Sequence, residues 1–165
     1  MNDARLPADT EPARIGRPSA RADEAPRIPS PAAAATSVEA ALRGFGLPGH
    51  WARQCDAPAS PDNNHVAFER AATGEMQEVF TFGPGIEPNV YTIISAVGVD
   101  NEPDQVRLGL VLRGVQNDVI LRVHDDTIRT LSSIRGDGTV LVKDGVITAN
   151  DDETHVLPRC SDAES

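Results

Sequence analysis

The chain has 165 residues, only 4 % of them aromatic, and a formal net charge of −10. This length suits one domain and is too short for two ordinary ones, and a core so poor in aromatic residues must be built mainly from Val, Ile and Leu. The negative charge disfavours nucleic acid and anionic membrane surfaces as partners, and no apolar run approaches the roughly 20 residues of a membrane-spanning helix.

Residues 1–36 are rich in Ala, Pro and Arg and contain almost no large apolar side chain. Such a segment buries too little surface to offset the entropy lost on ordering, so we predict a disordered arm. Its five acidic residues and five arginines cancel, which leaves the whole negative charge on the rest of the chain.

Residues 37–48 are predicted to form a short helix and a linker. Val38, Leu42 and Phe45 follow helical spacing, and Gly44 or Gly46 is the candidate end of the helix. One or two helical turns here are expected to pack over one end of the domain that follows.

Residues 49–160 are predicted to form a β domain, because hydrophobic residues then recur with a period of two. The clearest run alternates apolar residues with Arg107, Gly109, Val111 and Arg113, and its apolar members are Val106, Leu108, Leu110 and Leu112. A sheet with one buried face produces this pattern. In residues 75–82, one face of the expected strand carries Met76, Glu78, Phe80 and Phe82.

The expected strands are 65–68, 75–82, 90–99, 106–113, 119–123, 127–134, 139–142, 146–148 and 155–157. Turn-forming sequences separate them, including a polar turn at residues 100–104 and the Asp144-Gly145 pair. Seven to nine short strands at such spacing predict an all-β fold, a small antiparallel barrel or a sandwich. Residues 161–165 are left as a tail.

Two cysteines, Cys55 and Cys160, bracket the main run of strands and predict a disulfide. Closing a loop of about 100 residues stabilises a fold by up to roughly 4–5 kcal/mol in the chain-entropy model. The alternative is a pair of free, half-buried thiols. The spacing of Cys and His does not suit a metal site, and we predict neither metal nor cofactor.

The predicted disulfide favours an oxidising compartment, the bacterial periplasm or the cell exterior. Residues 1–31 lack the apolar stretch of about 7–15 residues that a secretory signal needs. A cytoplasmic protein with two free thiols is therefore the alternative localisation.

Gly49-His50-Trp51, which opens the predicted β domain, resembles the Gly-x-Trp signature of the lipocalin and calycin barrels. The resemblance implies a structural role for Trp51, with Arg159 stacking across its ring to close one end of a barrel. Residues 49–160 also resemble a group of short exported bacterial proteins of unassigned function, through Trp51, Cys55 and the terminal Arg159-Cys160. That likeness implies a fold and a terminal disulfide, and it implies no activity.

We expect no catalytic site, because no acid–base–nucleophile constellation stands out. His124-Asp125 and the acidic residues before His155 lie at predicted turns, where solvated acids and histidines are common. Four arginines fall on neighbouring strands, where they form either a patch for an anionic ligand or, as we favour, ordinary surface residues paired with acids. They are Arg107, Arg113, Arg122 and Arg129.

The predicted function is non-enzymatic binding of a small apolar or amphipathic molecule inside the barrel. The expected walls of the binding site are Val66, Phe68, Phe80, Phe82, Leu108, Leu110 and Leu112. Small barrels are also commonly filled by their own side chains. In that case the protein would be an interaction module whose partner is another envelope protein, for example a hydrolase that it inhibits.

Overall fold

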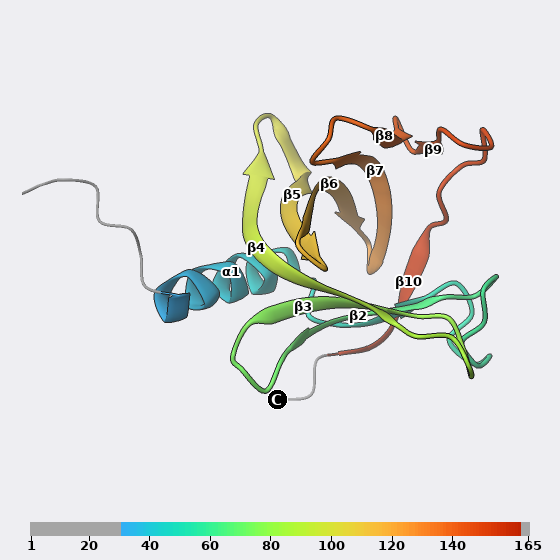
Figure 1. Ribbon diagram of the computed structural model, residues 1–165, viewed down its shortest axis with the longest axis horizontal. Helices are drawn as coiled ribbons and strands as arrows, with labels where there is room; N and C mark the ends of the chain where they lie inside the picture. The colour runs from blue at the N-terminus through green and yellow to red at the C-terminus, as the bar shows by residue number, and fades with distance from the viewer. Residues whose placement is uncertain (1–30, 163–165) are drawn as a thin grey trace, which may run out of the picture.

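A computed structural model describes residues 31–162 of the chain. Within that range the chain forms one helix and ten strands (Figure 1). They are α1 Pro31–Phe45, β1 Gly49–Ala52, β2 His65–Arg70, β3 Met76–Thr81, β4 Asn89–Val99, β5 Glu102–Leu112, β6 Val115–His124, β7 Thr127–Arg135, β8 Val140–Lys143, β9 Val146–Ile147 and β10 Leu157–Asp162.

Eight of these strands close into an antiparallel barrel. Strands β1 to β7 pair in chain order, and β10 pairs with both β1 and β7, which completes the ring. The short β8–β9 hairpin continues the sheet from β7 and stands outside the ring. The predicted all-β class is confirmed, and the closure through β10 makes the fold a barrel and not a sandwich.

The predicted alternation in β5 is confirmed by burial. Val106, Leu108 and Leu110 are at most 3 % exposed in the core, whereas Arg107 between them is exposed. Because successive side chains of a strand point to opposite faces, this pattern fixes which face of β5 lines the barrel.

The polar turn predicted at residues 100–104 is shorter than expected. β4 ends at Val99 and β5 already begins at Glu102, with Val99 paired to Glu102. Asn101 has a φ of 63°, a left-handed conformation that Asn tolerates better than most residues. The reversal therefore needs only Asp100 and Asn101, and the following residues join the sheet.

The last strand lies later in the chain than residues 155–157. β10 runs from Leu157 to Asp162, so Cys160 lies within it and part of the expected tail belongs to the sheet. Its sequence, Leu-Pro-Arg-Cys-Ser-Asp, has no apolar alternation from which it could be predicted. Pairing with β1 and β7 determines this strand. Residues 163–165 lie outside the described part of the chain.

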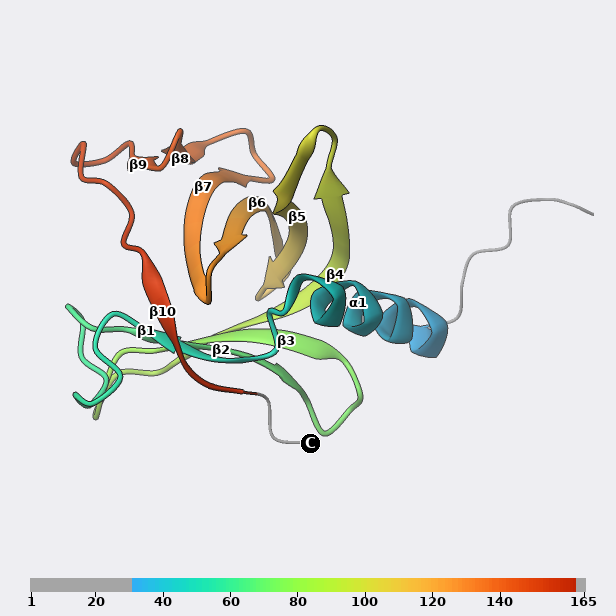
Figure 2. The ribbon, with the colours of Figure 1, turned by 180° about the vertical axis from the view of Figure 1, so that it is seen from behind.

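Helix α1 seals one end of the barrel (Figure 2). It begins at Pro31, earlier than the predicted start at residue 37. Proline is tolerated in the first helical turn and the alanines that follow are the strongest helix formers, so the helix extends into the predicted arm. Val38 and Leu42 enter the same hydrophobic cluster as Trp51 and Phe68. Residues 1–30 of the predicted arm lie outside the described residues.

Candidate ligand-binding site

A cavity of about 410 Å³ occupies the half of the barrel away from α1. Side chains of β3 to β7 form its inner wall, and the β8–β9 hairpin together with residues 154–157 covers it. Its main apolar lining is Phe80, Tyr91, Leu110, Val119, Leu141 and Leu157. Binding sites for small molecules typically have volumes of about 300–1,000 Å³ and mostly apolar walls, so this cavity has the size and chemistry of such a site.

The residues expected to form the walls separate into three groups by depth. Phe80 and Leu110 line the cavity. Val66, Phe68 and Leu108 point inward too, but they are at most 1 % exposed in the packed core nearer α1. The described cavity does not include them, and their assignment to a ligand site stays a prediction. Phe82 and Leu112 are half-buried and do not line the cavity.

The cavity includes only two of the expected wall residues because strand alternation reports the face of a side chain and not its depth along the barrel. Side chains of the sealed half fill the interior by themselves, together with Leu42 of α1. The half covered by the hairpin retains the cavity.

Glu78 is the one acidic side chain in the cavity lining. It lies on β3 between Met76 and Phe80 on the inward face and is 3 % exposed. Burial raises its pKa to about 8, because a carboxylate loses its hydration inside the barrel. Its Oε2 atom is buried and has no hydrogen-bond partner among the described residues.

Asn117 brings a second unsatisfied acceptor to the same cavity. It lies on β6, and its Oδ1 atom is likewise buried and without a partner in the described part of the chain. Tyr91, which pairs with Glu78 across β3 and β4, has a raised pKa because it is buried and faces the Glu78 charge. The apolar cavity thus contains a small polar centre.

The sequence contained a signal for Glu78 and none for Asn117. In residues 75–82 the alternation places an acid on the same face as Met76 and Phe80, and a charged residue on a buried face is unusual. Asn117 precedes the apolar part of β6, in a stretch of polar residues that does not reveal which face is buried.

The sealed end contains the contact that the lipocalin resemblance implied. The Arg159 guanidinium carbon lies 4.2 Å from the centroid of the fully buried Trp51 ring. Trp51 Nε1 donates to the Leu47 carbonyl at 2.9 Å, and Arg159 Nη1 donates to the Pro48 carbonyl at 3.1 Å. Arg159 also donates to the Gly46 carbonyl. These bonds tie the linker after α1 to β1 and β10.

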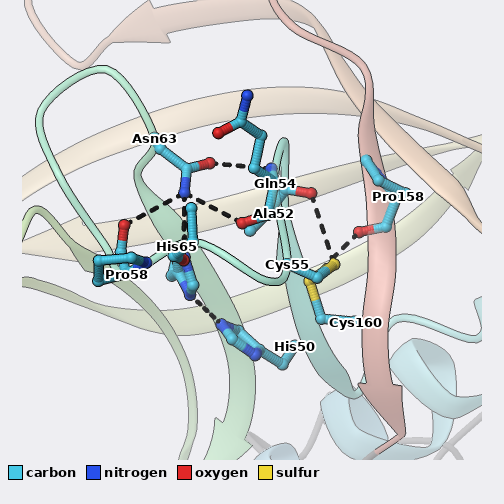
Figure 3. Close-up of a disulfide and its surroundings, with 10 residues drawn as sticks. His50, Ala52, Gln54, Cys55, Pro58, Asn63, His65, Pro158 and Cys160 are labelled. Carbon is cyan, nitrogen blue, oxygen red and sulfur yellow. Dashed lines mark hydrogen bonds between the residues drawn. A yellow bond between two sulfur atoms is a disulfide. The ribbon is translucent and has the colours of Figure 1, made fainter.

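The predicted disulfide between Cys55 and Cys160 is present (Figure 3). Their Cα atoms are 5.3 Å apart, and the bond joins the segment after β1 to β10. A disulfide is consistent with a non-reducing environment.

Beside the disulfide, His50 and His65 form a pair that the sequence did not reveal (Figure 3). His50 Nε2 and His65 Nδ1 are 2.8 Å apart, and His65 Nε2 lies 3.0 Å from the Ala57 carbonyl. A carbonyl only accepts, whereas the Asn63 amide nitrogen, 3.3 Å from the same His65 Nε2, only donates, so the tautomers of the two rings decide which nitrogen of the pair donates. Burial and the neighbouring His65 lower the pKa of His50. These contacts fasten the loop between β1 and β2.

The other two histidines differ in position. His124 makes a 3.0 Å contact with Asp125, and both side chains are exposed, as predicted for a solvated turn. His155 is exposed and contributes to the cavity lining, with its Nε2 atom 3.5 Å from Arg53 Nη1.

Three of the four arginines on neighbouring strands pair with acidic side chains, in agreement with the interpretation that we favoured from the sequence. Arg107 contacts Asp118 at 3.2 Å, Arg113 contacts Glu87 at 3.5 Å and Arg122 contacts Asp104 at 3.4 Å.

Arg129 differs, because it holds the hairpin that covers the cavity. It donates to the Thr154 hydroxyl at 3.2 Å and to the Gly145 carbonyl at 3.1 Å. Gly145 has a φ of 76°, and a Cβ atom there would lie 2.5 Å from the Arg129 guanidinium. Another residue at this turn would adopt a strained backbone conformation and displace the Arg129 guanidinium.

Among residues 31–162, no three His, Cys, Asp or Glu side chains gather as a metal site would need. Over the same range, no helix has the length and apolar character to cross a membrane. No protein-family model, curated protein or solved structure matches this chain.

Proposed function

We propose that this protein is a non-enzymatic binding module that carries a small apolar or amphipathic molecule in the barrel cavity. The observation that supports it is a cavity of about 410 Å³ with mainly apolar walls, in a barrel whose other half is tightly packed. The alternative of an interaction or inhibitor module required a barrel filled by its own side chains, and the cavity favours the carrier over it.

We further propose that the protein works in the periplasm or outside the cell. The Cys55–Cys160 disulfide supports this location, since such bonds persist where thiols are not kept reduced. The Trp51–Arg159 stack supports a similarity in architecture to the lipocalin-like barrels, some of which hold a small ligand.

Two adjacent serines of β7 provide a matched test. Ser133 lines the cavity, whereas Ser132 lies in a groove on the outer face of the barrel beside Arg122 and Lys143. A phenylalanine at position 133 would fill the cavity, and the same substitution at position 132 would leave it empty.

The probe is the neutral dye N-phenyl-1-naphthylamine, whose fluorescence rises on entering an apolar site. We expect saturable binding with one dye per chain for the native protein and for Ser132→Phe, and at least a roughly tenfold weaker affinity for Ser133→Phe. Circular dichroism verifies that both variants are folded. Equal affinities for the two variants, or no saturable binding to the native protein, would refute the proposal.

A further inference from the structure

We propose that the molecule carried in the barrel has an apolar body and a protonated amine head, and that Glu78 and Asn117 receive this head. This inference rests on the proposed carrier function and specifies the class of ligand. Its basis is a pair of buried acceptor oxygens, Glu78 Oε2 and Asn117 Oδ1, that belong to residues lining one cavity and have no partner among the described residues.

Unsatisfied buried acceptors are rare in native proteins. More than about 90 % of buried polar groups have a hydrogen-bond partner, because an unmade bond leaves the cost of desolvation uncompensated. Two such oxygens in a single cavity indicate that the missing donors come from the molecule bound there. The apolar side chains of Phe80, Leu110 and Val119 around them match the body of an amphiphile.

The charge distribution favours a cationic head over a neutral or anionic one. Glu78 and His155 are the charged or titratable residues in the cavity lining besides Tyr91, and no Lys or Arg lines it. Three arginines stand outside the lining: Arg135 lowers the pKa of Tyr91, Arg129 donates to Thr154 at 3.2 Å, and Arg53 lies 3.5 Å from His155. An ammonium group offers three donors and a full charge to the carboxylate, whereas an anionic head would place two negative charges together.

Burial leaves Glu78 with a pKa of about 8 in the empty barrel, so at neutral pH the carboxyl is mostly protonated. An ammonium beside it favours the charged form and lowers that pKa. Binding of an amine at neutral pH therefore releases a proton from Glu78. The affinity should rise with pH until Glu78 is fully ionised, and it should fall once the amine, with a pKa near 10.4 as in lysine, loses its own proton.

Three small amphiphiles that differ in their head group test this class of ligand directly: octylamine, octanol and octanoate. Each is titrated by calorimetry into the full-length protein at about pH 7.5. Glu78→Gln keeps the shape of the side chain and removes its charge. Glu87→Gln makes the same change at a carboxylate that is 81 % exposed, and it serves as the control.

We expect octylamine to bind at least roughly tenfold more tightly than octanol to the native protein and to Glu87→Gln, and octanoate to bind most weakly. In Glu78→Gln this preference for the amine should disappear while octanol binding persists. Calorimetry in buffers of different ionisation enthalpy should show that octylamine binding releases a proton from the native protein and from Glu87→Gln. Glu78→Gln should show no such release.

The outcomes separate this inference from the function on which it rests. If octanol or octanoate binds as tightly as octylamine, or if Glu78→Gln retains the amine preference, the ligand class is wrong and the carrier function stands. If none of the three probes binds to the folded protein, both are wrong.

Discussion

Replacing Glu78 by Gln should remove the largest pH-dependent term in the stability of the barrel. The folded-state pKa of Glu78 is about 8, against 4.5 for an ordinary glutamate. Below pH 4.5 the carboxyl is protonated in both the folded and the unfolded state. As pH rises from 4.5 towards 8, only the unfolded state loses the proton, so the native protein becomes progressively less stable, and above pH 8 the effect levels off.

At 1.36 kcal/mol per pH unit, this difference in pKa corresponds to about 4–5 kcal/mol of unfolding free energy. Glutamine cannot ionise, so the stability of Glu78→Gln relative to the native protein should increase by this amount between about pH 4.5 and pH 8. Urea denaturation followed by circular dichroism across that range measures it, with Glu87→Gln as the control that should show no such gain.

The reasoning would be refuted if the difference in unfolding free energy between Glu78→Gln and the native protein did not change with pH. That result would mean that Glu78 ionises in the folded protein as it does in water, and that its carboxyl is not desolvated. The proton release predicted on binding of an amine would then be absent as well.

Three further predictions concern residues that do not line the cavity. Arg159→Ala removes the stack on Trp51 and leaves two carbonyls unsatisfied, so urea denaturation should show a loss of about 2–4 kcal/mol, against less than about 0.5 kcal/mol for Arg113→Ala. Replacing both Cys55 and Cys160 by Ser should lower the free energy of unfolding by about 4–5 kcal/mol, since the bond spans 105 residues, and an unchanged urea midpoint would contradict this. His50 has a lowered pKa, so the unfolded state takes up its proton first as pH falls below 6.5, and the native protein loses stability there. His50→Gln should not show this loss when urea midpoints are compared between about pH 5 and pH 7, and parallel midpoints would count against the His50–His65 pair.

Much of the fold was predictable because one face of most strands is buried. The alternation around Leu108 and Leu110 predicted a strand and showed which of its faces is buried. The two cysteines indicated that the beginning and the end of the β domain lie together. β10 was mostly missed, because its residues are held by pairing to strands far away in the chain. Whether the sheet closes depends on that strand, so barrel and sandwich were not distinguishable from the sequence.

The cavity was predictable in kind and not in position. Inward-facing apolar residues such as Phe68 and Phe80 look alike in the sequence, yet one lies in the packed half and the other borders free volume. Depth along the barrel depends on where α1 and the β8–β9 hairpin pack, which local patterns do not encode. Glu78 differs, because an acidic residue on an apolar strand face is unusual at any depth in the barrel and is a signal of a site, although we predicted no site from it.

The central claim is that the half-open barrel holds a small molecule, and native mass spectrometry without reductant tests it most directly. The protein and its Ser133→Phe variant would be purified from the cells that produce the protein naturally. We predict a discrete added mass on the native protein that is absent from Ser133→Phe, in chains that both carry the disulfide. Bare mass for the native protein, or the same adduct on both chains, would contradict the account.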